Sequence, residues 1–131
     1  MSADRDSGLV HLRSPRSVEA TLGRIEAVLR EAGLAIFCVV DHSGEAERAG
    51  MQMRPTKLVL FGNPSAGTPM MVAAPTVAID LPMKALIWQD EAGRVLVSYN
   101  TADYLRSRHG VPEDLLKGVS SAGALLEMAV D

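Results

Sequence analysis

Hydrophobic positions near the start of the chain predict a strand followed by a helix. Apolar residues recur three or four positions apart from Val18 to Ala32, on one face of a helix. Ser17 can cap the first turn, because its hydroxyl can accept a hydrogen bond from a free backbone amide. Gly33 stands where a left-handed residue commonly ends a helix. We therefore predict a helix between Ser17 and Gly33, after a short first strand at residues 9–12.

The next segment, LAIFCVV at residues 34–40, is apolar at every position. This pattern predicts a strand buried on both faces, either in the centre of a sheet or between a helix and a partner subunit. The following strand, residues 57–61, comes about 15 residues later, which is enough for a helical crossover. Such a crossover would end both strands at the same edge of the sheet. His42 would then lie near Asn63.

The second half of the chain predicts a hairpin. Residues 85–89 and 95–99 are strand-like and are joined by DEAGR, in which Gly93 supplies the positive φ of a tight turn. Pairing of the two strands would bring Lys84 beside Tyr99, within about two residues of register. Helices are expected over three further segments, at residues 45–49, 101–108 (capped by Thr101) and 121–130.

These elements predict an α+β fold. We expect a two-layer sandwich of about five strands in mixed or antiparallel order, with helices packed on one face. Residues 15–131 would form a single compact domain after a partly flexible N-terminus, residues 1–14. Residues 34–40 would leave an apolar sheet face exposed, so we expect a homodimer formed through that face or through the final helix.

Composition narrows the class of protein. The 131 residues are 47% hydrophobic and 22% charged, which is typical of a soluble globular domain. The net charge of −3 and the scattered basic residues disfavour nucleic-acid binding, which needs a concentrated positive face. The longest apolar run is too short to cross a membrane. With a single cysteine and no signal-like start, we expect a cytoplasmic protein of bacterial type.

Five short motifs follow one another in an order and spacing that are specific together. They are VVDHSGEAERAGM at 39–51, FGNP at 61–64, GTPMM at 67–71, DLPMK at 80–84 and VSYNTADYLRSRHG at 97–110. With these motifs, the sequence resembles the domain of unknown function 302 family over residues 15–130. The resemblance implies a compact two-layer α+β domain, often found as a homodimer, and no established reaction.

The loop after residue 61 is a candidate anion site. A strand, a glycine turn and a helix start are the parts from which phosphate sites are built, and we expect the helix to begin near Thr68 and Pro69. However, Pro64 and Pro69 each lack a backbone donor, and no phosphate-binding glycine motif is present. A tight turn with local Asn63 bonding is therefore the favoured interpretation. The alternative is a small carboxylate or phosphate on the helix start at Thr68.

His42 is the candidate general base, because it follows a buried strand and Asp80 is its expected carboxylate neighbour in space. The alternative is a structural histidine that caps the helix at Ser43. Lys84 beside Tyr99 and Asp80 could stabilise a developing oxyanion, or its stem could simply pack on the tyrosine ring.

We expect no metal and no cofactor. The three histidines are far apart in the sequence, without the paired spacing of metal ligands, and the methionines are typical core fillers. Cys38 lies in an apolar strand without a basic neighbour, which predicts an inert thiol.

Three functions remain open at this point. The first is a homodimeric domain that binds a small molecule or anion, the second is a hydrolase- or lyase-like enzyme with His42 as general base, and the third is a structural or partner-binding module. The first requires segments far apart in the sequence to meet at one rim of the sheet. The predicted ligand-binding residues are His42, Phe61, Asn63, Thr68, Asp80, Lys84 and Tyr99.

Overall fold

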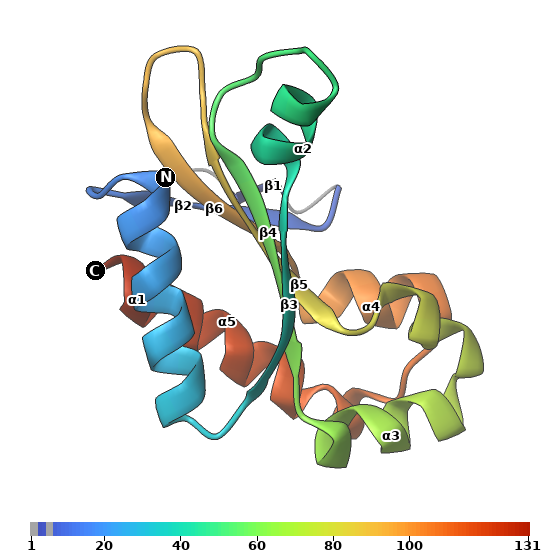
Figure 1. Ribbon diagram of the computed structural model, residues 1–131. Coiled ribbons are helices and arrows are strands. Elements are labelled where there is room, and N and C mark those ends of the chain that lie inside the picture. Colours follow the sequence, from blue (N-terminus) through green and yellow to red (C-terminus); the bar gives the residue numbers. More distant parts are fainter. Residues whose placement is uncertain (1–2, 5–6) are drawn as a thin grey trace.

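A single antiparallel sheet organises the chain (Figure 1). The structure, a computed structural model, describes residues 3–4 and 7–131. Six strands pair in the order β1-β2-β6-β5-β4-β3. Their bounds are Ala3–Asp4 (β1), Leu9–Ser14 (β2), Ala35–Asp41 (β3), Thr56–Gly62 (β4), Met83–Gln89 (β5) and Val95–Asn100 (β6). The flexibility predicted for the N-terminus falls in part on residues 1–2 and 5–6, which lie outside the described residues.

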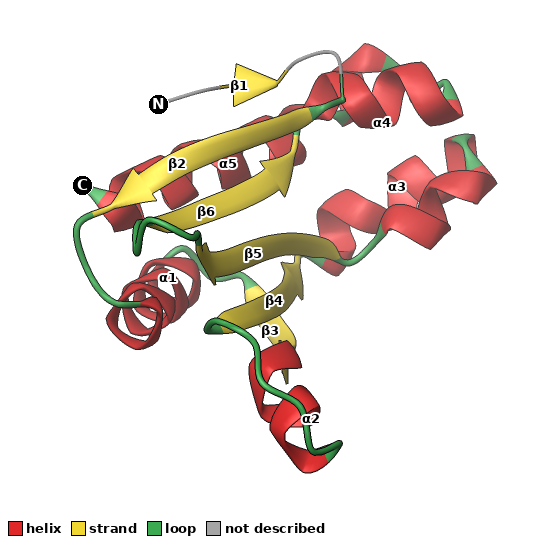
Figure 2. Cartoon of the chain, turned by 90° about the horizontal axis from the view of Figure 1, so that it is seen from above, coloured by secondary structure: helices red, strands yellow, loops and turns green. Residues whose placement is uncertain are grey.

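The two longest helices cover one face of this sheet (Figure 2). The predicted α+β fold with helices on one face is therefore confirmed. Helix α2 lies at one end of the sheet, whereas α3 and α4 gather at the other end (Figure 1). The helices are α1 (Val18–Glu31), α2 (His42–Arg48), α3 (Pro64–Ala73), α4 (Ala102–His109) and α5 (Lys117–Val130), with short 3-10 helices at η1 (Pro75–Asp80) and η2 (Glu113–Leu115).

Helix α1 forms where the hydrophobic spacing predicts it. The Ser17 hydroxyl accepts a hydrogen bond from the backbone N–H of Ala20, and Gly33 follows the helix with φ of 81°. The apolar stripe of α1 faces the core, where Ile25 and Leu29 are fully buried. Strand residues that alternate in sequence complete this core from the sheet side: Val59, Phe61, Ala85, Ile87 and Val97.

Strand β3 lies at the edge of the sheet, so the predicted central position is wrong. Phe37 is 53% exposed, and Cys38 is exposed rather than buried in an apolar strand. The same apolar pattern is expected for a central strand and for an edge strand that pairs with a partner subunit, so the sequence does not distinguish them. Cover by a partner subunit, the second possibility, stays a prediction.

The predicted crossover between β3 and β4 is also wrong. The two strands are antiparallel neighbours, with Asp41 opposite Lys57 and Ala35 opposite Gly62. The connection consists of the short helix α2 and a loop that reverses the chain direction, so it does not form a crossover. His42 therefore lies at the opposite end of β4 from Gly62, about five strand residues or roughly 17 Å away.

Helix α3 begins earlier than predicted. It starts at Pro64 rather than near Thr68, and Pro69 lies inside it. Proline suits a first helical position because the backbone N–H that it lacks would have no partner there. The Asn63 side chain supplies the cap, since its Oδ1 accepts a hydrogen bond from the Ser65 N–H at 3.0 Å. This supports the turn interpretation of the loop.

The predicted hairpin and its neighbours are confirmed. Gly93 has φ of 83° in the β5–β6 turn, and the Thr101 hydroxyl caps α4 by accepting from the Tyr104 N–H. The final helix starts at Lys117 and is therefore longer than expected.

Two isoleucines test the assignment of the core. Ile25 is 0% exposed and Ile79 is 73% exposed. Ile25→Ala should lower the free energy of unfolding by about 2–5 kcal/mol, because it leaves a cavity between α1 and the sheet. Ile79→Ala should change it by less than about 0.5 kcal/mol. Chemical denaturation of both variants measures this, and equal losses would contradict the packing described.

Candidate functional site

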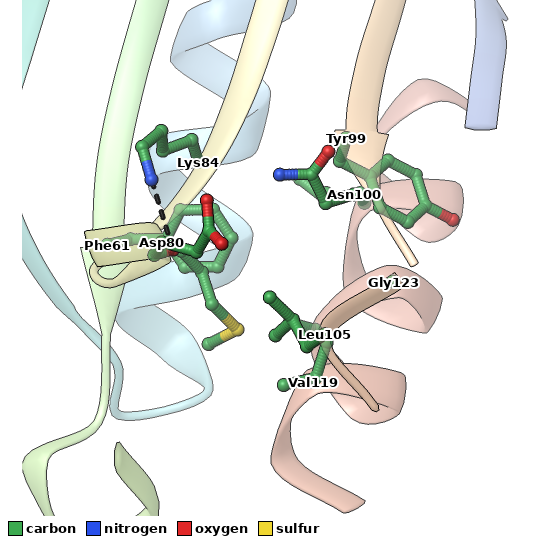
Figure 3. Close-up of a pocket in the computed structure, with 11 residues that line it drawn as sticks. Phe61, Asp80, Lys84, Tyr99, Asn100, Leu105, Val119 and Gly123 are labelled. Carbon is green, nitrogen blue, oxygen red and sulfur yellow. Dashed lines mark hydrogen bonds between the residues drawn. The ribbon is translucent and has the colours of Figure 1, made fainter. Parts of the chain in front are cut away.

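The sheet splits between β5 and β6 at one end. These strands pair with each other only from Gln89 opposite Val95 to Leu86 opposite Ser98. Beyond that point β5 stays paired with β4, and β6 stays paired with β2 as far as Asn100. The two strands therefore part, and Lys84 and Asn100 lie on opposite sides of the gap (Figure 3).

A small cavity occupies this split. Its volume is about 20 Å³, which is room for about one water molecule. The polar part of its lining comes from the sheet and from the end of η1, namely Asp80, Lys84, Tyr99 and Asn100. The apolar part comes from the core below it, including Phe61, Met83, Leu105, Val119 and Leu126.

The Lys84 ammonium is held at the rim by backbone carbonyls. Its Nζ donates to the carbonyl oxygens of Asp80 at 3.1 Å and Pro82 at 3.0 Å. An ammonium group has three hydrogens to donate, so one remains after these two bonds. In the described part of the chain, no carboxylate forms an ion pair with Lys84. The cavity therefore receives a positive charge that is not directly paired with a carboxylate of the described residues.

Asn100 adds an amide to the other side of the cavity. In Figure 3 its side-chain nitrogen points across the cavity toward the side that carries Lys84. Among the described residues, its side chain has no hydrogen-bond partner. An amide group and an ammonium with unused donors thus face one small space. Such converging donors are suited to an anion or an oxygen acceptor.

The Asp80 carboxylate is engaged with other groups. Its Oδ2 lies 2.5 Å from His109 Nε2 and 3.4 Å from Arg108 Nη1. His109 is nearly buried, and its Nδ1 lies 2.9 Å from the Thr76 hydroxyl. The expectation that Asp80 partners His42 is therefore wrong. Asp80 ties η1 to the end of α4, where its carboxylate is hydrogen-bonded to His109 and lies beside the Arg108 guanidinium.

Arg108 belongs to the same cluster of contacts, and we call Asp80, Arg108 and His109 together the Asp80 clasp. Its guanidinium donates to the Tyr104 hydroxyl at 2.6 Å, and this bond, together with the nearby charge of Asp80, raises the pKa of Arg108. Arg108 therefore remains cationic beside Asp80.

Tyr99 forms the wall of the cavity on the helix side. Its ring lies against Gly123 of α5, where an added Cβ would come within 3.2 Å of the ring and hydroxyl. Its hydroxyl points away from Lys84 (Figure 3). Burial, with a smaller contribution from the charge of Glu127, raises the pKa of Tyr99. Lys84 and Tyr99 share the cavity as predicted, but the phenol is not aimed at the ammonium.

The remaining predicted site residues lie elsewhere. His42 is the first residue of α2, and Asp41 rather than His42 caps that helix, by accepting from the Gly44 N–H. Asn63 and Thr68 line a separate apolar cavity of about 250 Å³ beneath α3. The predicted single rim is wrong, because β3 and β4 are antiparallel and place His42 and Asn63 at opposite ends.

The two cavities are neighbours, since Met83 and Val119 line both. Four of the seven predicted residues share the smaller one, namely Phe61, Asp80, Lys84 and Tyr99. Asn100 was missed, although it ends the apolar run of β6 one residue after Tyr99. Within the described residues, no group of three or more His, Cys, Asp or Glu side chains is arranged to hold a metal ion.

Comparison with known sequences gives a family match and two long relatives. The sequence matches the family described as Domain of unknown function DUF302 over residues 10–131. "Fluoride-specific ion channel FluC 1" of Brucella suis biovar 1 is 38% identical over 128 residues, which are 98% of this chain and 48% of that protein. A protein of the same name from Brucella abortus biovar 1 is also 38% identical over 128 residues, covering 45% of its length.

The chain thus spans less than half the length of these curated relatives. None of the helices in the described part of this chain has the length and apolar character needed to cross a bilayer. Among solved structures, an uncharacterized conserved DUF302 protein from Bacillus stearothermophilus has the same fold. It superposes with a TM-score of 0.78 over 95% of this chain and 96% of that chain, at 15% identity.

The raised pKa of Tyr99 predicts a dependence on alkaline pH. The folded state holds the neutral phenol, so this contribution to stability is present below the unfolded pKa of about 10 and is lost as pH rises through the higher folded pKa. The chain has two tyrosines, and Tyr104→Phe leaves Tyr99 alone. The phenolate absorbance of folded Tyr104→Phe should then titrate at a higher pH than that of the same variant in denaturant. Equal midpoints would contradict the burial of Tyr99.

Proposed function

We propose that this chain, which belongs to the DUF302 family, is a binding domain that takes a small anion at the split between β5 and β6. The observation that carries the proposal is the pair of unused donors on Lys84 and Asn100, which face the same cavity. Lys84 is positively charged and has no carboxylate partner in the described part of the chain. Charged donors bind anionic oxygens more strongly than neutral donors do.

The clasp around Asp80 supports this assignment. A free carboxylate in the cavity would repel an anion, but the Asp80 oxygen is held by His109 and Arg108. The local balance is therefore one ammonium against a carboxylate that is already engaged by the Arg108 guanidinium and hydrogen-bonded to His109. This arrangement favours an anion over a cation at the cavity.

The size of the cavity limits what can enter it. A volume of about 20 Å³ admits a monatomic anion or one end of a carboxylate, and no larger group. Formate is therefore a suitable probe. Fluoride is a second probe, because two curated relatives are named fluoride-specific ion channels, although this chain spans less than half of each.

Thermal unfolding with sodium formate and sodium fluoride tests the proposal. At 100 times its dissociation constant, a bound anion adds about 2.7 kcal/mol to the free energy of unfolding, which raises Tm by several degrees. Lys84→Met should weaken the apparent affinity at least tenfold, and Asn100→Leu should also weaken it. Each variant is compared with its own anion-free Tm, so that a change in basal stability is not counted as binding.

Lys117→Met is the matched control, since Lys117 is an exposed lysine on α5 outside the cavity. It should keep the anion shift of the wild type. Shifts of equal size in Lys84→Met and Lys117→Met would show a general salt effect and would contradict the proposed site.

We also propose that the domain works as a homodimer joined through the edge strand β3. The exposed Phe37 and Val39 of this strand are apolar, and an edge strand offers unpaired backbone groups to a second copy. The resulting interface would be isologous, with β3 antiparallel to its copy. It would leave the β5–β6 split accessible, because two strands' width of sheet lies between them.

A charge on β3 tests the dimer. Phe37→Lys should reduce the mass measured by light scattering after gel filtration from two chains to one, because the interface would bury unpaired ammonium groups. Val72→Lys is the control, since Val72 is 76% exposed on α3 and does not line the cavity that Phe37 shares with that helix. A wild-type protein that runs as a monomer at high concentration would contradict the proposal.

Catalysis by His42 receives no support from the geometry. The side chain of His42 has no hydrogen-bond partner among the described residues, and the cavity lies toward the other end of the sheet. We therefore propose binding as the function.

We also propose that the protein is located in the bacterial cytoplasm, where the exposed thiol of Cys38, the single cysteine, would stay reduced.

A further inference from the structure

The face of the sheet opposite α1 and α5 carries a groove that begins at the proposed anion site. Neither long helix covers this face (Figure 2). The groove has a volume of about 400 Å³, within the range of sites for small organic molecules. Lys84 and Asn100 line both this groove and the small cavity. The split between β5 and β6 therefore connects the anion donors with a much larger space.

The floor of the groove is apolar. Leu58 and Leu86 stand opposite each other on β4 and β5, and both are only partly buried. Alternation along β5 explains this, since Ala85 and Ile87 face the helices and are fully buried, which leaves Leu86 on the open face. Leu58 and Leu86 do not pack into the core between sheet and helices, so their side chains are available to contact an apolar ligand.

Trp88 forms an aromatic wall that is held in place. Its Nε1 donates to the Ser98 hydroxyl at 2.8 Å, and the same hydroxyl lies 2.6 Å from His11 Nδ1. Ser98 is only 5% exposed although it lies on the open face, because these rings cover it. The His11 and Trp88 rings meet edge to face, with centroids 6.4 Å apart. A ring fixed in this way loses little freedom when a ligand packs against it.

We propose that the ligand is an organic acid with a flat apolar body: its carboxylate binds Lys84 and Asn100, and its body lies on Leu58, Leu86 and Trp88. This inference rests on the proposed anion site and specifies its ligand class. Lys84 and Trp88 are four residues apart on β5, or roughly 13 Å between Cα atoms. An aryl-alkanoic acid, in which a short chain separates ring and carboxylate, would extend from Lys84 over Leu86 toward Trp88.

The single tryptophan makes the groove directly observable, because all indole fluorescence comes from Trp88. We would titrate the full chain with three probes: sodium 3-phenylpropionate, sodium formate and the neutral alcohol 3-phenylpropanol. The acid should change the fluorescence of Trp88 and bind at least tenfold more tightly than formate in the thermal assay. It should also bind at least tenfold more tightly than the alcohol.

Two pairs of variants assign the contacts. Lys84→Met should weaken 3-phenylpropionate at least tenfold and leave 3-phenylpropanol unchanged, whereas Lys117→Met should change neither. Leu86→Glu should weaken the acid at least tenfold, because it places a negative charge on the groove floor. Leu96→Glu is its control, since Leu96 lies on the same face outside the groove. Thermal melts of the free variants show that each is folded.

The outcomes separate the two proposals. If formate binds through Lys84 but 3-phenylpropionate binds no more tightly, the groove assignment is overturned and the anion site stands. If no anion binds in a Lys84-dependent way, both fall. Tight binding of 3-phenylpropionate that is equal in wild type and Lys84→Met, or equal in Leu86→Glu and Leu96→Glu, also overturns the assignment.

Discussion

The end of backbone pairing between β5 and β6, beyond Leu86 and Ser98, is the constraint on which the candidate site depends. Each strand remains paired with its outer neighbour, so the sheet continues on both sides of the gap. In a continuous sheet Lys84 and Asn100 would be neighbours on one face. Because the strands part, their side chains instead line a cavity that connects the helix layer with the open face.

The charges around this split are arranged in two separate sets. Asp80 is held by His109 and Arg108 at the end of α4, and this clasp also joins η1 to α4. Lys84 is held by the backbone carbonyls of Asp80 and Pro82. Asp80 thus takes part in both sets. Its carboxylate contacts His109 and Arg108, and its backbone carbonyl accepts a hydrogen bond from Lys84. The separation keeps the lysine charge available to a ligand, which a direct Lys84–Asp80 ion pair would not.

Local patterns predicted most local structure, apart from the starts of α3 and α5, and the failure that misplaced the site came from pairing between distant segments. Ser17, Gly33, Gly93 and Thr101 mark element ends through contacts within a few residues, so the sequence is sufficient for them. The antiparallel pairing of β3 with β4 depends on how their connection turns, which the hydrophobic pattern does not encode. Because β4 was expected to run parallel to β3, His42 was expected at the wrong end of β4. The hairpin, whose register follows from its turn, correctly brought Lys84 and Tyr99 to one cavity.

The most direct test of the account is a nuclear magnetic resonance titration of the isotopically labelled chain with formate. We predict that the side-chain amide of Asn100 shifts most, together with the backbone amides of Lys84 and Tyr99 across the split. These shifts should saturate with one affinity, because one site produces them. Shifts that instead centre on the start of α3, or that leave the Asn100 amide unchanged while formate binds elsewhere, would contradict it.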